Sequence, residues 1–179
     1  IFDINNLVFE VSSTFRKNIE GKNIQYILEY NNTIPHLLIG DSTKIKQILH
    51  NLISNSIKFT SNGYIKLKLD IFQKKKNRIF LSFEVEDTGC GINEKKQKSL
   101  FEKFEQGEHF LTKKHGGTGL GLALVKQLMD LLEGYIEVNT VIDKGTKFKL
   151  IIPFELAVTE KETLSFNENF ADSGQGKIL

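Results

Sequence analysis

Residues 42–60 read Ser-Thr-Lys-Ile-Lys-Gln-Ile-Leu-His-Asn-Leu-Ile-Ser-Asn-Ser-Ile-Lys-Phe-Thr and form the most strongly patterned segment of the chain. Asp41 or Ser42 is a suitable N-cap, and the apolar residues that follow recur three and four positions apart. This spacing predicts one long helix with a wide buried stripe. The stripe consists of Ile45, Ile48, Leu49, Leu52, Ile53, Ser56 and Ile57.

A line of polar residues runs along the same helix beside the apolar stripe. Asn51, Asn55 and Lys58 lie at i, i+4 and i+7, so they share one face, and Lys44 and Gln47 extend the line. A solvated helix flank more often carries pairs of Glu and Lys, although an ordinary polar flank remains an alternative for this feature alone. An amide carbonyl is a hard oxygen ligand that suits Mg²⁺, an ion that commonly keeps waters and takes few protein ligands beside phosphate.

A second motif, Glu-Asp-Thr-Gly-Cys-Gly-Ile at residues 86–92, follows a predicted strand. Gly89 and Gly91 permit backbone conformations that other residues avoid, and they let a flat ligand approach closely. Asp87 can accept a hydrogen bond from an exocyclic amine such as that of adenine. The motif alone also fits any tight turn from a strand to a helix. We expect Cys90 to be a small buried residue and not a reactive thiol.

A third motif, His-Gly-Gly-Thr-Gly-Leu-Gly-Leu at residues 115–122, leads into a predicted helix. Glycines before a helix N-terminus present backbone N–H groups and the positive end of the helix dipole to phosphate. The segment is not a Walker A loop, because no Gly-Lys-Ser/Thr closes it, and it does not follow a strand as a dinucleotide fingerprint does. A flexible hinge is the alternative function for these glycines.

The rest of the chain alternates between hairpins and helices. Strands are predicted at 23–30, 64–72, 78–86, 135–140 and 146–154, and helices at 3–20, 94–104 and 120–132. Residues 106–118 lack an apolar period and are expected to form a mobile loop. Residues 74–77, Lys-Lys-Lys-Asn, are expected to be a solvated hairpin tip and not a binding patch. This order predicts an α+β two-layer sandwich with a mixed, largely antiparallel sheet packed against helices.

In this order and spacing, the motifs closely resemble those of the histidine kinase catalytic domain. N-L-I-S-N-S-I-K-F-T, D-T-G-C-G, F-E-K-F and G-G-T-G-L-G-L resemble that family's N, G1, F and G2 boxes, over residues 1–154. The resemblance implies the Bergerat fold, which is shared with gyrase B, the mismatch-repair protein MutL and a large heat-shock chaperone. It also implies a pocket for ATP and Mg²⁺ between sheet and helices, closed by residues 106–118 as a lid.

The resemblance also implies roles for individual residues. Asn55 and Asn51 would hold Mg²⁺, and Asn51 and Lys58 would be the catalytic residues, with Lys58 at the phosphates. Asp87 would bind the adenine amine, with Thr146 supporting it. Phe101 and Phe104 would anchor the lid base, or else are ordinary core aromatics. The remaining residues implied to contact ATP are Phe59, Gly89, Gly91, Ile92, Gly117, Thr118, Gly119, Leu120, Gly121 and Leu122.

Asn51 distinguishes between transfer and hydrolysis within this superfamily. Hydrolysing relatives place a Glu one helical turn before the metal-binding Asn, where it takes a proton from water; an amide at that position cannot act as a base. A neutral imidazole already has a free lone pair, so phosphoryl transfer to histidine depends less on a base here. The sequence therefore favours a protein-histidine kinase. The alternatives are an ATPase of the gyrase or chaperone type and a non-catalytic nucleotide-binding module.

The four histidines lie outside the sequence context of a phosphoacceptor, so we expect a fragment that cannot phosphorylate itself. The expected partners are a dimerisation and phosphoacceptor helical domain of the same protein and a receiver domain or response regulator. Residues 155–176 are predicted to be a linker, and residues 177–179 resemble the start of a receiver domain. The full-length protein is expected to be a homodimer.

Composition limits the environment of the chain. The net charge of +2 gives no electrostatic reason to expect nucleic acid or an anionic membrane as a partner. The single cysteine excludes an intrachain disulfide and the usual structural zinc patterns, and it is typical of a reducing compartment. We therefore expect a cytoplasmic domain, whether or not the full-length protein is anchored in a membrane.

Overall fold

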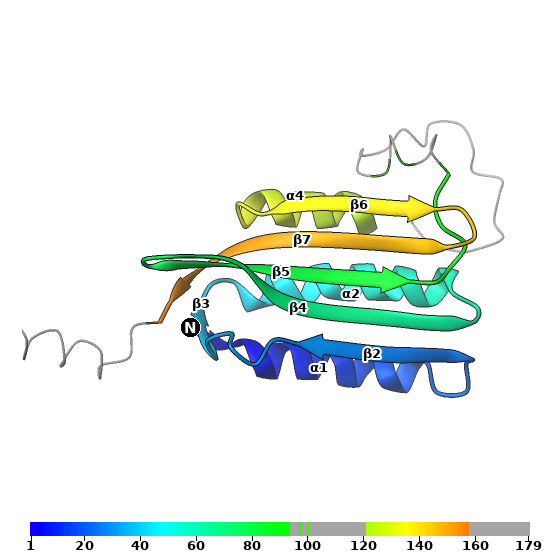
Figure 1. Cartoon of the computed structure of the whole chain (residues 1–179), viewed down its shortest axis with the longest axis horizontal. Helices are drawn as coiled ribbons and strands as arrows, with labels where there is room; N and C mark the ends of the chain where they lie inside the picture. The colour runs from blue at the N-terminus through cyan, green and yellow to red at the C-terminus, as the bar shows by residue number, and fades with distance from the viewer. Residues whose placement is uncertain (94–96, 98–99, 101–120, 158–179) are drawn as a thin grey trace, which may run out of the picture.

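The computed structural model describes residues 1–93, 97, 100 and 121–157. Three helices cover one face of a seven-stranded sheet (Figure 1). The helices are α1 (Ile4–Asn18), α2 (Ser42–Phe59) and α4 (Gly121–Leu131). The strands are β1 (Phe2–Asp3), β2 (Ile24–Tyr30), β3 (Leu37–Ile39), β4 (Gly63–Lys75), β5 (Arg78–Asp87), β6 (Tyr135–Val141) and β7 (Gly145–Leu156).

The first two helices begin at the aspartates expected to cap them. The carboxylate of Asp3 accepts hydrogen bonds from the backbone N–H groups of Asn5 and Asn6, at 2.7 and 3.1 Å. The carboxylate of Asp41 accepts from the backbone N–H of Lys44 at 3.0 Å. These bonds satisfy N–H groups that have no partner within the helix, which fixes where each helix starts.

The sheet has the strand order β1-β3-β7-β5-β4-β2, and β6 pairs with the first part of β7 on the same side as β3. Among the described strands, only β2 and β4 pair in parallel, with Tyr26 opposite Ile65 and Tyr30 opposite Leu69. All other pairs are antiparallel, so the prediction of a mixed, largely antiparallel sheet in an α+β fold is confirmed. Strand β7, the last of the described strands, has neighbours on both sides: β5 on one, and β6 and then β3 on the other.

The core lies between the helices and one face of the sheet. The predicted apolar stripe of α2 is buried there, with Ile45, Ile48 and Leu52 at 0% exposure. Alternate residues of β5, from Ile79 to Val85, pack against it from the sheet side. The apolar face of the helix, which repeats about every 3.6 residues, thus packs against the apolar face of the strand, which repeats about every 2 residues, in a single core. Among the described helices, none is both long and apolar enough to cross a membrane.

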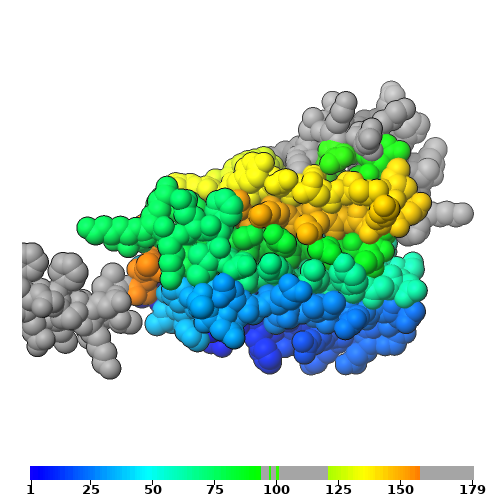
Figure 2. Space-filling view, in the orientation of Figure 1, coloured from blue at the N-terminus to red at the C-terminus, as the bar shows by residue number. Residues whose placement is uncertain are grey.

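The other face of the sheet carries charged side chains that pair across the strands. The Oε2 atom of Glu86 on β5 lies 3.5 Å from the Nζ atom of Lys66 on β4 and 3.2 Å from the Nζ atom of Lys147 on β7. Lys149 of β7 lies 3.8 Å from Glu84 of β5. Figure 2 views the molecule from this side, with the strands as successive bands and the β4–β5 hairpin tip projecting beyond them. The charges explain how this face stays in contact with water without a helical layer.

Some elements differ from the sequence expectation in length. Strand β4 continues to Lys75, so the polar turn is shorter than the predicted 74–77 segment, and the apolar run at 37–39 forms β3. Strand β7 continues through Glu155 and Leu156, which pair with β3, so the first two residues of the predicted linker belong to the sheet. The predicted 94–104 helix, the 106–118 loop and the segment from residue 158 onward lie largely or wholly outside the described residues.

Candidate functional site

The polar line of α2 lies against the start of α4. Asn51 and Asn55 are both half-buried there. A Cβ atom added to Gly121, the first residue of α4, would lie 3.2 Å from Oδ1 of Asn51 and 3.9 Å from Nδ2 of Asn55. The fold therefore brings two side-chain amides to the N-terminal end of a helix, where backbone N–H groups and the helix dipole favour an anion.

Asp87 is the last residue of β5, and its side chain is only 7% exposed. Its Oδ1 atom accepts hydrogen bonds from the backbone N–H groups of Gly89, at 2.9 Å, and Thr146, at 3.3 Å. Its Oδ2 atom accepts from the hydroxyl of Ser56 on α2, at 2.9 Å. Donors from three separate parts of the chain thus hold one buried carboxylate in a fixed orientation.

Burial raises the pKa of Asp87 above the ordinary value of an aspartate. The hydrogen bonds from Gly89, Ser56 and Thr146 oppose this rise, since they stabilise the charged form. A buried carboxylate with a raised pKa makes Asp87 a candidate for a ligand-binding group.

Ser56 belongs to the predicted apolar stripe of α2 and is not among the site residues predicted from the sequence. Its side chain is 2% exposed and donates to Asp87. A serine within an otherwise aliphatic stripe was the available signal, because a buried hydroxyl needs a partner. Nothing in the spacing identified Asp87 as that partner.

Thr140 of β6 is a second residue that the sequence did not indicate. Its hydroxyl accepts a hydrogen bond from the backbone N–H of Ile92 at 2.9 Å and donates to the carbonyl of Gly145 at 3.1 Å. It also lies 3.0 Å from the hydroxyl of Thr146. One threonine therefore joins the β6–β7 hairpin to the segment after β5. This segment and the hairpin both lie next to Asp87.

The segment after β5 packs tightly against the C-terminal end of α2. The backbone N–H of Cys90 donates to the carbonyl of Phe59 at 3.3 Å, and a Cβ atom on Gly89 would lie 2.6 Å from that carbonyl oxygen. Gly91 has φ of +69°, and a Cβ atom there would lie 2.2 Å from the carbonyl oxygen of Val141. Both glycines are required by this close approach of backbone to backbone.

The expectation that Cys90 is buried is wrong. Its side chain is exposed, with the sulfur 3.5 Å from the carbonyl oxygen of its neighbour Gly91. The physical reason is that the backbone N–H of Cys90 and the two flanking glycines take up the inward side of this turn. The side chain at position 90 is consequently directed to the surface.

The other residues that the sequence predicts for the site are partly within the described residues. Lys58 and Phe59 are exposed at the C-terminal end of α2, with the Lys58 ammonium 5.1 Å from the centre of the Phe59 ring. Ile92 and Leu122 are partly buried and pack against the core. Gly117, Thr118, Gly119, Leu120, Phe101 and Phe104 lie outside the described residues.

The donor set fits a metal that is held mainly by phosphate and water. Nδ2 of Asn51 donates to the carbonyl of Gln47 at 3.0 Å, which leaves Oδ1, the harder ligand atom, on the side of Gly121. In the part of the chain that the structure describes, no three His, Cys, Asp or Glu side chains gather into a cluster suited to a metal. Mg²⁺ takes few protein ligands beside phosphate, so the amide oxygen of Asn51, with the amide of Asn55 beside it, is compatible with it.

Comparison with known proteins gives relatives of one kind. The chain is 38% identical over 170 residues to the autoinducer 2 sensor kinase/phosphatase LuxQ of Vibrio vulnificus, covering 93% of this chain and 20% of that protein. It is 36% identical over 149 residues to hybrid signal transduction histidine kinase A of Dictyostelium discoideum, covering 79% of this chain and 7% of that protein. The chain thus spans a fifth or less of the length of these two relatives.

The chain is also similar to solved structures. Full-length ShkA, in complex with AMPPNP, matches with a TM-score of 0.72 and 28% identity over 88% of this chain and 31% of that one. A nucleotide-free catalytic domain of the histidine kinase ThkA matches with a TM-score of 0.62 and 28% identity, covering 85% of this chain and 92% of that one. The model of the family described as histidine kinase-, DNA gyrase B- and HSP90-like ATPases matches residues 40–156. This chain belongs to that family of ATPases.

Proposed function

We propose that this chain is the catalytic part of a sensor histidine kinase, which binds ATP with Mg²⁺ and transfers the γ-phosphoryl group to a histidine on a separate helical domain. One observation carries the proposal: α2 contacts both the buried carboxylate of Asp87, through Ser56, and the start of α4, through Asn51 and Asn55. An adenine amine at the carboxylate and a triphosphate at the start of α4 would satisfy both.

Each residue of the site would have a role that its environment supports. Asp87, fixed by Ser56 and two backbone N–H groups, would accept a hydrogen bond from the adenine amine. The start of α4 would face the phosphates, and the exposed Lys58 has the reach to approach them. Asn51 and Asn55 would hold Mg²⁺, which when bound neutralises negative charge on the phosphate oxygens.

Phosphoryl transfer, rather than hydrolysis, is supported by the environment of Asn51. Its amide donates to the carbonyl of Gln47 within α2 and has no group that could take a proton from water. The acceptor would be supplied from outside the chain. Of the two described histidines, His50 packs against Phe15 of α1 with the ring centres 4.8 Å apart, and His36 precedes β3 and contacts Asn5.

The partners are inferred from the relatives. Hybrid histidine kinases and a sensor kinase/phosphatase are among them, and each is much longer than this chain. We propose that the acceptor histidine lies on a dimerisation domain of the same full-length protein, that the phosphoryl group then passes to a receiver domain, and that the working form is a homodimer in the cytoplasm, where ATP is available.

Phosphotransfer in trans tests the proposal. The 179-residue chain would be incubated with Mg²⁺, γ-labelled ATP and a separately purified helical domain that carries the phosphoacceptor histidine of a histidine kinase. We expect label on the helical domain that is stable to base and lost in acid, and no label on the chain alone. Steady release of free phosphate without labelled acceptor would instead indicate an ATPase, and binding without either product would indicate a nucleotide-binding module.

The metal assignment has its own test. Asn55→Ala is expected to abolish the gain in ATP affinity that Mg²⁺ provides, because it removes an amide oxygen from the half-buried line on α2. The matched control is Asn6→Ala, which changes an exposed asparagine on α1. Calorimetric titration of both variants with a non-hydrolysable ATP analogue, with and without Mg²⁺, measures the effect. Equal Mg²⁺ dependence in the two variants would show that Asn55 is not a ligand.

A further inference from the structure

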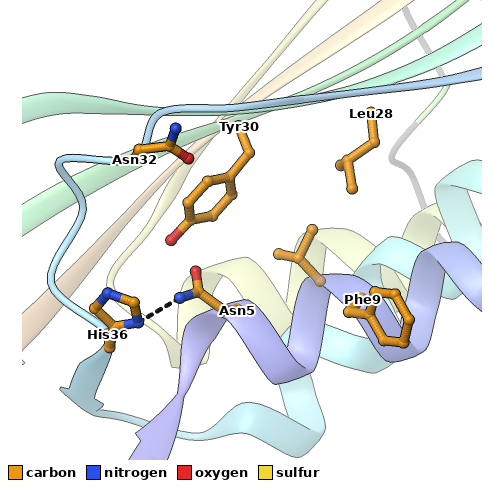
Figure 3. Close-up of a pocket in the computed structure, with 7 residues that line it drawn as sticks. Asn5, Phe9, Leu28, Tyr30, Asn32 and His36 are labelled. Atoms are coloured by element: carbon orange, nitrogen blue, oxygen red, sulfur yellow. Dashed lines mark hydrogen bonds between the residues drawn. The ribbon is translucent and has the colours of Figure 1, made fainter.

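A cavity of about 430 Å³ lies between α1 and the edge strand β2, outside the site described above. Asn5, Val8 and Phe9 line it from α1, Leu28 and Tyr30 from β2, and Asn32 and His36 from the segment that leads to β3. Figure 3 shows these side chains converging from the three segments. The volume falls within the range of small-molecule sites, which is about 300–1,000 Å³.

Two buried polar atoms of the lining lack a hydrogen-bond partner among the described residues. These are the hydroxyl of Tyr30 and Oδ1 of Asn5. The Asn5 amide group itself donates to Nδ1 of His36, so its orientation is fixed and its oxygen remains available as an acceptor. Figure 3 shows the Tyr30 hydroxyl directed toward Asn5 and His36. A buried polar atom without a partner costs free energy, so this end of the cavity favours a ligand that supplies the missing bonds.

The lining is neutral and is divided into two halves. None of its seven residues is an Asp, Glu, Lys or Arg, and Val8, Phe9 and Leu28 form an apolar half beside the polar end. Phe9 is 69% exposed, so a ring placed on it would bury an aromatic face that is now in water. Burial raises the pKa of Tyr30, and the negative charge of Asp3 raises it further. The carboxylate of Asp3 thus acts on this end of the cavity, and its negative charge disfavours an anionic ligand there.

We propose that this cavity is a second ligand site, specific for a neutral compound with a small aromatic or alicyclic ring and one carboxamide or hydroxyl group. The amide or hydroxyl would donate to Oδ1 of Asn5 and accept from the Tyr30 hydroxyl, and the ring would pack on Val8, Phe9 and Leu28. Neither atom has to move to make these bonds, because His36 already holds the Asn5 amide.

The cavity is separate from the proposed nucleotide site in both sequence and space. Its residues come from positions 5–36, whereas the nucleotide site uses positions 51–146. Across the sheet, Tyr30 is level with Leu69 and Phe83, while Asp87 is level with Ile65 and Tyr26. A ligand here would therefore leave Asp87 and Asn55 accessible, and the two sites can be tested independently.

The probe is benzamide, and benzoate is its charged counterpart of nearly the same shape. In two-dimensional NMR of the labelled 179-residue chain, benzamide is expected to shift the signals of residues 5–9, 28–32 and 36 at millimolar concentration, and benzoate is expected to bind at least about tenfold more weakly. Shifts confined to the region around Asp87, equal binding of the two compounds, or no shift at all would each overturn the proposal.

Tyr30→Phe removes only the hydroxyl and is expected to weaken benzamide binding by about fivefold, the effect of one neutral hydrogen bond. Tyr135→Phe, on the exposed face of β6, is the matched control and should bind benzamide as the unaltered chain does. Because the Tyr30 hydroxyl has no partner among the described residues, its loss should not lower thermal stability. Unchanged benzamide affinity in a folded Tyr30→Phe chain would show that the hydroxyl is not part of a site.

Discussion

Asp87 keeps a carboxylate in a position where an uncharged side chain would be easier to bury. Its raised pKa means that folding favours the protonated form. The stability that protonation contributes is therefore present at low pH and is lost as the pH rises from about 4 through the raised pKa. At neutral pH the ionised group reduces stability, which is expected if the residue is retained to bind a ligand.

Asp87→Asn should separate stability from binding. The amide oxygen can still accept from Gly89 and Thr146, and its NH₂ group can donate to Ser56, so the fold should be retained. We expect a free energy of unfolding at pH 7.5 that is unchanged or higher, and ATP affinity that is lower by at least about tenfold. Urea unfolding from pH 4 to 8 should show that the free energy of unfolding of the variant increases relative to that of the unaltered chain as the pH rises. A constant difference between them would contradict the raised pKa.

Ser56→Ala should have the opposite effect on stability. It removes the hydroxyl that donates to Oδ2 of Asp87 and leaves a buried carboxylate oxygen unpaired, at a cost of about 1–3 kcal/mol. Ser54→Ala, an exposed serine on the same helix, should change stability by less than about 0.5 kcal/mol. Urea unfolding at pH 7.5 compares the two variants. Equal stabilities would mean that the Ser56 hydroxyl contributes nothing to holding Asp87.

At the scale of elements, the β6–β7 hairpin and the segment after β5 fit together through glycine. Gly91→Ala would place a Cβ atom 2.2 Å from the carbonyl oxygen of Val141, in addition to the strain of φ at +69°. Gly21→Ala is a matched control, because its φ is +81° but nothing lies within 4 Å of the added atom. We expect a loss of about 1 kcal/mol for Gly21→Ala and at least about 2 kcal/mol for Gly91→Ala, measured by urea unfolding. Equal losses would show that the hairpin moves aside without cost.

Elements with a strong period were predictable from the sequence, and contacts between distant elements were not. The apolar stripe of α2 and the alternation of β4 gave the helix and the strand, because each period reports which face is buried. The asparagine line on α2 was also visible as a shared face. The parallel pairing of β2 with β4 and the hydrogen bond from Ser56 to Asp87 depend on how elements pack, which no local pattern reports.

The error at Cys90 has the same origin. Small residues between glycines are often buried, but exposure here is decided by the backbone bond from Cys90 to Phe59, 31 positions earlier in the chain. The functional roles assigned to the residues of α2, β5 and β7 remain predictions that the variants above test.

At the scale of the whole molecule, the last two residues of β7 attach β1 and β3 to the rest of the sheet. Glu155 and Leu156 pair with β3, which in turn pairs with β1. A chain of residues 1–154 should therefore be less stable by about 1–2 kcal/mol than a chain of residues 1–157, because it loses these backbone bonds. Urea unfolding of the two chains measures the difference. Identical midpoints would mean that β3 and β1 are held by other contacts.

The position of β7 has a consequence for the order in which the molecule can form on the ribosome. Of the described strands, the last to emerge from the exit tunnel is the one that separates β3 from β5 and supplies Thr146 to Asp87. Until it emerges, the nascent chain has β1 and β3 on one side and β5, β4 and β2 on the other, with no strand to join them. Strand β7 must therefore have emerged before the carboxylate of Asp87 acquires its full set of donors.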